Sequence, residues 1–253
     1  MKIRAIILSA LILCGISAVI MYSRAAQPLQ KSSVITQAIN DKNTPMVIKN
    51  LILKMKEQME VNDDQFPELI KEVENYTNSC ADSASVAVLH SMLAEMYQNY
   101  FQRNQWTINQ RTQLSGYIPE DIRVWTSNLF TDKIKEEIDL SLRPTALLQN
   151  TPVSKFKDIL EIGKDSQTLR PTLYEFLAFR ALDIQPTVQI YKDLIAFQNK
   201  EPNMKSVLLT ELDYLRFLYG DKRDKESFEA YMNALDELYR NLASQNYAAE
   251  ILI

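Results

Sequence analysis

The amino-acid sequence predicts an all-α fold: an array of antiparallel helices, with an α-solenoid in the C-terminal half, after an N-terminal signal or anchor helix. Only four of the 253 residues are glycine. Because tight β-turns and phosphate-binding loops depend on glycine, this count disfavours both a β-rich fold and a Gly-rich nucleotide loop. Apolar residues also recur at helical spacing along most of the chain, separated by short polar breaks.

Residues 1–26 have the organisation of a signal peptide or a membrane anchor. A basic start, MKIR, precedes the uncharged and mostly apolar run AIILSALILCGISAVIMY. Small residues at Ser23 and Ala25 fit cleavage after Ala25. The apolar run is at the lower length limit of a membrane-spanning helix, so a cleaved leader and an uncleaved anchor both stay open. We therefore expect an exported protein of the periplasm or cell envelope.

Residues 27–43 are polar and predict a linker, and residues 44–165 predict a first helical region. In Thr44-Pro45, a cap residue is followed by a proline suited to the first helical turn. The strongest helix is predicted for Ser83 to Arg103, with Asp82 as its cap. This helix has a broad apolar stripe: Val86, Leu89, Met92, Leu93, Met96, Tyr97, Tyr100 and Phe101.

Before this helix, a helix with Phe66, Leu69, Ile70, Val73 and Tyr76 on one face is expected, and after it the first region predicts three shorter helical pieces. Two of them, Ile122 to Phe130 and Thr131 to Leu142, follow a connection that contains Gly116 and Pro119. Thr151-Pro152 repeats the cap-plus-proline start, and we expect its helix to end at Gly163, a suitable residue just beyond a helix C-terminus.

Residues 166–253 predict a helical repeat-like region whose C-terminus is open to truncation, because the sequence ends inside a helical pattern. Its helices are expected within 169–184, 187–199, 203–219 and 224–243, with Gly220 just after the third. Segments of this length with short connections resemble the helix pairs of an α-solenoid. Tetratricopeptide-like packing is expected as a shape, since no strict repeat consensus occurs.

The stretch LRPTLYEFLAFRALDI has only three charged residues after its proline: Glu175, Arg180 and Asp183. On a helix with about 100° per residue they fall within a sector of about 140°. Glu175 and Asp183 could form an acid/base carboxylate pair. We favour a structural interpretation, in which Arg180 pairs with Asp183 and orients packed helices while Glu175 caps a helix or pairs with a neighbour. All three are predicted interface residues, and no catalytic residue is predicted.

Other chemistry-bearing residues are few. Outside the leader, Cys80 and His90 are the only cysteine and the only histidine, too few ligands for a Cys/His zinc site. They are ten residues apart across a predicted helix start, which disfavours a nucleophile–base pair. The net charge is −4 and no basic cluster follows the leader, so nucleic acid is not an expected partner. We expect no enzyme activity, cofactor or metal, and protein partners.

Three long stretches carry a family resemblance: VAVLHSMLAEMYQNYFQRNQW, NQRTQLSGYIPEDIRVWTSNLF and TPVSKFKDILEIGKDSQTLRPTLYEFLAFRALD. They resemble the N-terminal helical region of the large alpha-2-macroglobulin-like proteins of Bacteroidetes-type bacteria, above all in Arg170 to Leu182. The resemblance implies an exported relative of protease-trapping inhibitors, which have β-sandwich macroglobulin domains, a bait segment and often a Cys-x-Glu-Gln thioester. This sequence has no Cys-x-Glu-Gln and too few glycines for β-sandwiches, so the trapping chemistry transfers to no residue.

Two functional hypotheses follow from these observations. The first is a non-enzymatic, exported helical module that docks to the missing macroglobulin domains or to an envelope protein. The alternative is a stand-alone, membrane-associated α-solenoid adaptor of tetratricopeptide type, attached to the membrane through residues 1–26.

Overall fold

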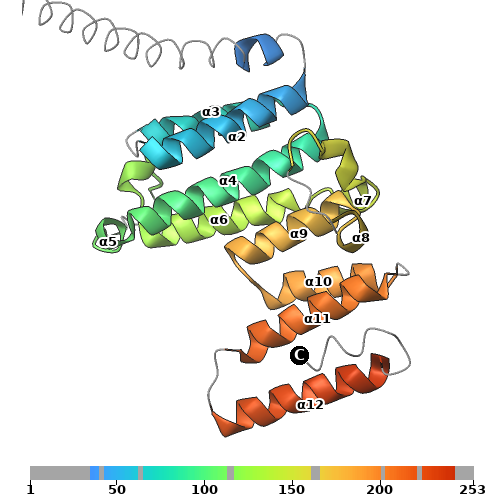
Figure 1. Cartoon of the computed structure of the whole chain (residues 1–253). Helices are drawn as coiled ribbons and strands as arrows, with labels where there is room; N and C mark the ends of the chain where they lie inside the picture. Colours follow the sequence, from blue (N-terminus) through green and yellow to red (C-terminus); the bar gives the residue numbers. More distant parts are fainter. Residues whose placement is uncertain are drawn as a thin grey trace, which may run out of the picture. The chain divides into compact units, whose positions relative to one another are not determined.

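The computed structural model describes residues 35–39, 43–61, 65–112, 117–160, 166–200, 203–220 and 224–242. Over these ranges it contains α-helices and short 3-10 turns but no β-strand (Figure 1), so the all-α prediction is confirmed. The chain divides into two units, Met1–Asp63 and Asp64–Ile253. The predicted signal or anchor segment and most of the predicted linker lie outside the described residues.

The first unit contains helix α2, Thr44–Val61. The side chain of Asn43 accepts a hydrogen bond from the backbone N–H of Met46 (3.2 Å). The cap is therefore one residue earlier than the predicted Thr44, and Pro45 lies within the first turn, where a missing N–H costs no helical hydrogen bond. The apolar side chains Val47, Ile48, Leu51 and Met55 of α2 are buried.

The second unit contains ten α-helices and two 3-10 turns within its described residues. In chain order these elements are α3 (Phe66–Ser79), α4 (Ser83–Arg103), α5 (Gln105–Ile108), η2 (Ile122–Val124), α6 (Ser127–Ser141), α7 (Thr145–Gln149), η3 (Val153–Phe156), α8 (Ser166–Leu169), α9 (Leu173–Ile184), α10 (Val188–Gln198), α11 (Met204–Tyr219) and α12 (Lys225–Leu242). Helix α4 is central to this unit, because α3, α6 and α9 all pack against it (Figure 1).

Helix α4 has the predicted bounds and the predicted cap. The side chain of Asp82 accepts a hydrogen bond from the backbone N–H of Ser85 (3.1 Å). In the second half of α4, Tyr97 stacks on Trp125 with ring centroids 5.7 Å apart, and Trp125 contacts Phe130 of α6 at 5.3 Å. The indole N–H of Trp125 donates to the carbonyl of Pro119 (2.6 Å). These aromatic contacts connect α4, α6 and the segment before α6 in one core.

Two predicted helices differ from the structure in the segment 122–142. Instead of adjoining pieces, a short turn, η2, is followed by one continuous helix, α6, from Ser127. Trp125 and Thr126 interrupt the helical pattern in extended conformation, with ψ values of 150° and 167°. Because the Trp125 side chain enters the aromatic core, the tertiary contact outweighs the local helical preference.

The predicted helix after Thr151-Pro152 is also wrong. The backbone N–H of Val153 donates to Pro171 (2.9 Å), and that of Leu173 donates to Thr151 (2.8 Å). Pro152 thereby forms an isolated antiparallel bridge with Thr172. Because these backbone groups form hydrogen bonds with residues 171–173, they are not available to a helix, and only the turn η3 forms. The predicted helix end at Gly163 lies outside the described residues.

Gly220 follows α11 as expected, but its backbone is right-handed, with φ −60° and ψ −32°. A Cβ atom at this position would lie 2.5 Å from the carbonyl oxygen of Arg216. Glycine is therefore required by a close approach of the backbone, not by the left-handed conformation that a glycine after a helix usually supplies.

From α9 onward, each helix packs against the next one in the chain: α9 on α10, α10 on α11 and α11 on α12 (Figure 1). Helix α9 also packs against α4 and α7, so helices on both sides of the predicted 165/166 boundary contact each other. In the described ranges, no helix combines the length and the apolar composition needed to cross a bilayer.

Candidate functional site

Glu175 joins two helices through its carboxylate. Its backbone N–H donates to the hydroxyl of Thr172 (3.2 Å), and its side chain accepts from the Thr172 backbone N–H (3.1 Å), which forms a capping box at the start of α9. The second carboxylate oxygen accepts from the side-chain amide of Gln198, at the end of α10 (3.2 Å). Glu175 is 4% exposed, so these contacts satisfy a buried carboxylate.

Arg180 binds α4. Its guanidinium donates to the hydroxyl of Ser91 (3.0 Å) and forms an ion pair with Glu95 (2.5 Å). Within the described residues this pair replaces the predicted pairing with Asp183, because α4 packs directly against α9. Asp183 is exposed and lies with Arg180 at a small polar hollow of about 290 Å³. Partial desolvation raises the pKa of Asp183, and the positive charges of Arg170 and Arg180 oppose that shift.

The structure therefore separates the three charged residues of α9. The Glu175 carboxylate contacts α10 while Arg180 contacts α4. The carboxylate pair that acid/base chemistry would need is not assembled from Glu175 and Asp183.

Cys80 and His90 have different surroundings. The Cys80 thiol is 3.9 Å from the carbonyl oxygen of Asp82. The His90 ring nitrogen Nδ1 is 2.7 Å from a carboxylate oxygen of Glu137 on α6. The other oxygen of Glu137 pairs with Lys133 (2.8 Å), and the Glu137 side chain is 3% exposed. His90 thus belongs to a charged network that holds α4 to α6.

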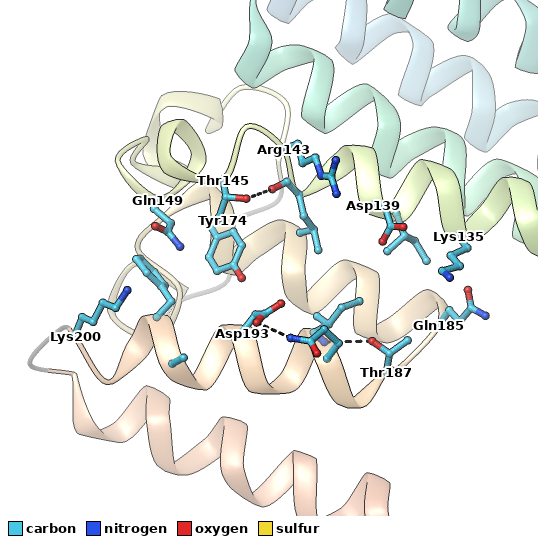
Figure 2. Close-up of a pocket in the computed structure, with 16 residues that line it drawn as sticks. Lys135, Asp139, Arg143, Thr145, Gln149, Tyr174, Gln185, Thr187, Asp193 and Lys200 are labelled. Atoms are coloured by element: carbon cyan, nitrogen blue, oxygen red, sulfur yellow. Dashed lines mark hydrogen bonds between the residues drawn. The ribbon is translucent and has the colours of Figure 1, made fainter.

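A larger cavity lies in a part of the fold where no site was predicted. It has a volume of about 730 Å³ and is bordered by α6, α7, α9 and α10 (Figure 2). We call it the α6–α10 groove. Apolar side chains form part of its lining: Ile138 and Leu142 from the α6 side, and Ile190 and Phe197 from α10.

Charged side chains line the same groove. Lys135, Asp139 and Arg143 lie at and just after α6, at spacings of four residues; Asp193 and Lys200 lie at and just after α10 (Figure 2). Asp193 accepts a hydrogen bond from the amide of Gln189 (2.8 Å). Among the residues that the structure describes, the three cations Lys135, Arg143 and Lys200 have no ion-pair partner.

Tyr174 of α9 contributes a hydroxyl group to the α6–α10 groove. The residue is 4% exposed, and its ring packs edge-on against Phe197 with centroids 5.2 Å apart. The hydroxyl points into the groove (Figure 2) and makes no hydrogen bond within the described part of the chain. Burial, together with the negative charge of Asp193, raises the pKa of Tyr174 to about 12. The phenol is therefore protonated at neutral pH and is available as a hydrogen-bond donor.

Two side-chain amides in the groove are also available. Gln149 of α7 and Gln185, in the connection between α9 and α10, line the groove (Figure 2), and their side-chain amides form no hydrogen bond within the described ranges. An amide both donates and accepts, so it is complementary to a peptide group.

The sequence carried one weak sign of this groove, the charges at 135, 139 and 143, because spacing by four residues places them on one helix face. The rest depends on α6 and α10, which are separated by about fifty residues of chain, and no motif in that interval predicts that these two helices line one groove. The described residues contain no group of three or more histidine, cysteine, aspartate or glutamate side chains placed to hold a metal ion.

Comparisons with family models, curated proteins and solved structures found no match to this chain. The resemblance to alpha-2-macroglobulin-like proteins stays a prediction from the sequence.

Proposed function

We propose that this chain is an exported, non-enzymatic helical module that acts by protein–protein contact and is related to the N-terminal part of a bacterial alpha-2-macroglobulin-like protease inhibitor. The observation that carries the proposal is a contrast in charge pairing. Between packed helices, Arg180 of α9 pairs with Glu95 of α4, and His90 of α4 contacts Glu137 of α6. In the α6–α10 groove, the three cations have no ion-pair partner in the described part of the chain.

This contrast favours a binding role for the groove charges. An exposed ion pair contributes only about 0–1 kcal/mol to stability, so unpaired exposed cations cost the fold little. An excess of unpaired positive charge over the aspartates Asp139 and Asp193, beside a concave and partly apolar surface, does influence the choice and the approach of a partner. A partner with acidic residues fits this surface better than a basic one.

The partner is expected in the cell envelope, reached through the export signal or anchor in residues 1–26. It is either a protein with macroglobulin domains or another envelope protein. A pull-down from the envelope fraction, with the segment Gln27–Ile253 as bait, tests the proposal. We expect a discrete partner that a bait with Lys135→Glu and Lys200→Glu recovers poorly. Equal recovery by both baits, or conversion of a substrate by the purified chain, would contradict it.

The alternative is a stand-alone, membrane-associated α-solenoid adaptor of tetratricopeptide type. The consecutive packing of α9, α10, α11 and α12 supports it, because each helix of a solenoid contacts its neighbours in the chain. A partner without macroglobulin domains, together with membrane association that requires residues 1–26, would favour this adaptor.

A further inference from the structure

We infer that the α6–α10 groove binds an extended peptide segment that carries acidic side chains alternating with apolar ones. This inference rests on the proposed contact function and adds the chemistry of the contact. Three features of the groove support it: its length, its two free amides and the arrangement of its charged and apolar side chains.

The length of the groove suits a short peptide. It follows α10 from Gln189 to Lys200, a span of about 16 Å at a rise of about 1.5 Å per residue. An extended chain advances about 3.3 Å per residue, so about five residues cover this distance. The cavity volume of about 730 Å³ is within the range of about 300–1,000 Å³ that is usual for ligand pockets.

The free polar groups suit a peptide backbone. The amides of Gln149 and Gln185 can each donate to a carbonyl and accept from an N–H of an extended segment. The Tyr174 hydroxyl, which points into the groove (Figure 2) and has no hydrogen-bond partner within the described residues, can donate to a carbonyl or a carboxylate. A compact anion would leave most of these dispersed groups without a contact.

The side-chain preference follows from alternation. Successive residues of an extended peptide point to opposite sides. One set of side chains would contact the apolar lining, which includes Ile138, Ile190 and Phe197. The other set would face the exposed charges of the groove, where Lys135, Arg143 and Lys200 outnumber Asp139 and Asp193, and Asp193 is already bonded to Gln189. Acidic side chains are therefore favoured at these positions.

Binding of a labelled pentapeptide tests this inference. The probe is a fluorescein-labelled peptide with an amidated C-terminus and the sequence Glu-Leu-Glu-Leu-Glu, and its counterpart replaces each Glu with Lys. Fluorescence anisotropy with the purified chain should show the acidic peptide binding at least tenfold more tightly than the basic one. Inorganic phosphate and glutarate at equal ionic strength should not displace it. Equal binding of the two peptides, or displacement by either small anion, would overturn the inference.

Variants assign the binding to the groove. The double variant Lys135→Glu/Lys200→Glu should weaken the acidic peptide at least tenfold. Tyr174→Phe, which keeps the ring on Phe197, should weaken it several-fold with an unchanged melting temperature. Lys157→Glu, an exposed charge reversal outside the groove, is the matched control and should bind as the wild type does. Weaker binding in the Lys157→Glu control, or unchanged binding in the groove variants, would place the peptide elsewhere and refute the assignment.

The two proposals fail in distinguishable ways. If the envelope partner is recovered but the acidic peptide neither binds nor competes with it, contact function stands and the peptide inference falls. If the acidic peptide binds in the groove but no envelope partner is recovered, the peptide inference stands and the proposed contact with an envelope protein falls.

Discussion

Replacing Glu175 with alanine tests whether the most buried charge of α9 is structural. The substitution removes the Glu175 half of the capping box, in which the carboxylate accepts from the Thr172 backbone N–H, and such a hydrogen bond contributes about 1 kcal/mol. It also leaves the buried amide of Gln198, which is 1% exposed, without its carboxylate acceptor. An unsatisfied buried polar group costs about 1–3 kcal/mol, so we expect Glu175→Ala to lower the free energy of unfolding by about 2–4 kcal/mol.

Urea denaturation followed by circular dichroism measures this loss. With a denaturant slope of about 1–3 kcal/mol per molar, the midpoint should fall by about 1 M or more. Glu175→Gln keeps the size and one acceptor oxygen, so its loss should be smaller. The matched control is Glu226→Ala, which removes an exposed glutamate from the first turn of α12 and should cost less than about 1 kcal/mol. Equal midpoints for Glu175→Ala and Glu226→Ala would refute the structural role.

Two further predictions concern charges with different surroundings. Arg180→Met removes the ion pair with Glu95, and the two side chains of this pair are 33% and 36% exposed. The unfolding free energy should therefore fall by no more than about 1 kcal/mol in thermal or urea melts. A loss as large as that of Glu175→Ala would contradict this. Burial raises the pKa of Glu211 on α11 above its usual 4.5, so the wild type loses stability as pH rises through the folded-state pKa. Glu211→Gln should therefore melt at a higher temperature than the wild type at pH 7, and this difference should vanish below about pH 4.5. A difference in melting temperature that persists at low pH would exclude ionisation of Glu211 as its cause.

Local signals predicted the helices whose ends depend on neighbouring residues. Helix α4 begins after the Asp82 cap and ends at Arg103, as predicted, because its cap and its apolar stripe lie in one continuous segment. The same signals failed at Thr151-Pro152, where the backbone hydrogen bonds go to Pro171 and Leu173, about twenty residues away. A cap motif does not reveal that its backbone groups are engaged elsewhere.

Partners of charged side chains were predicted less well than helices. Arg180 was paired with Asp183, its neighbour in the same turn, whereas its ion pair is with Glu95, which is 85 residues away in the chain. For Glu175, capping and pairing with another helix were left as alternatives, and its carboxylate does both. The α6–α10 groove was missed because it forms only where four elements pack together, and no motif within any one of them reveals that packing.

Site-specific photocrosslinking from within the groove tests the proposed contact function most directly. A benzoyl-phenylalanine in place of Gln149, whose side chain lies in the groove (Figure 2), would be illuminated in intact cells that express the full chain. We expect a single protein adduct, which the Lys135→Glu/Lys200→Glu background abolishes and the Lys157→Glu background leaves intact. No adduct, or an adduct of equal yield in all three backgrounds, would contradict a function by contact at this groove.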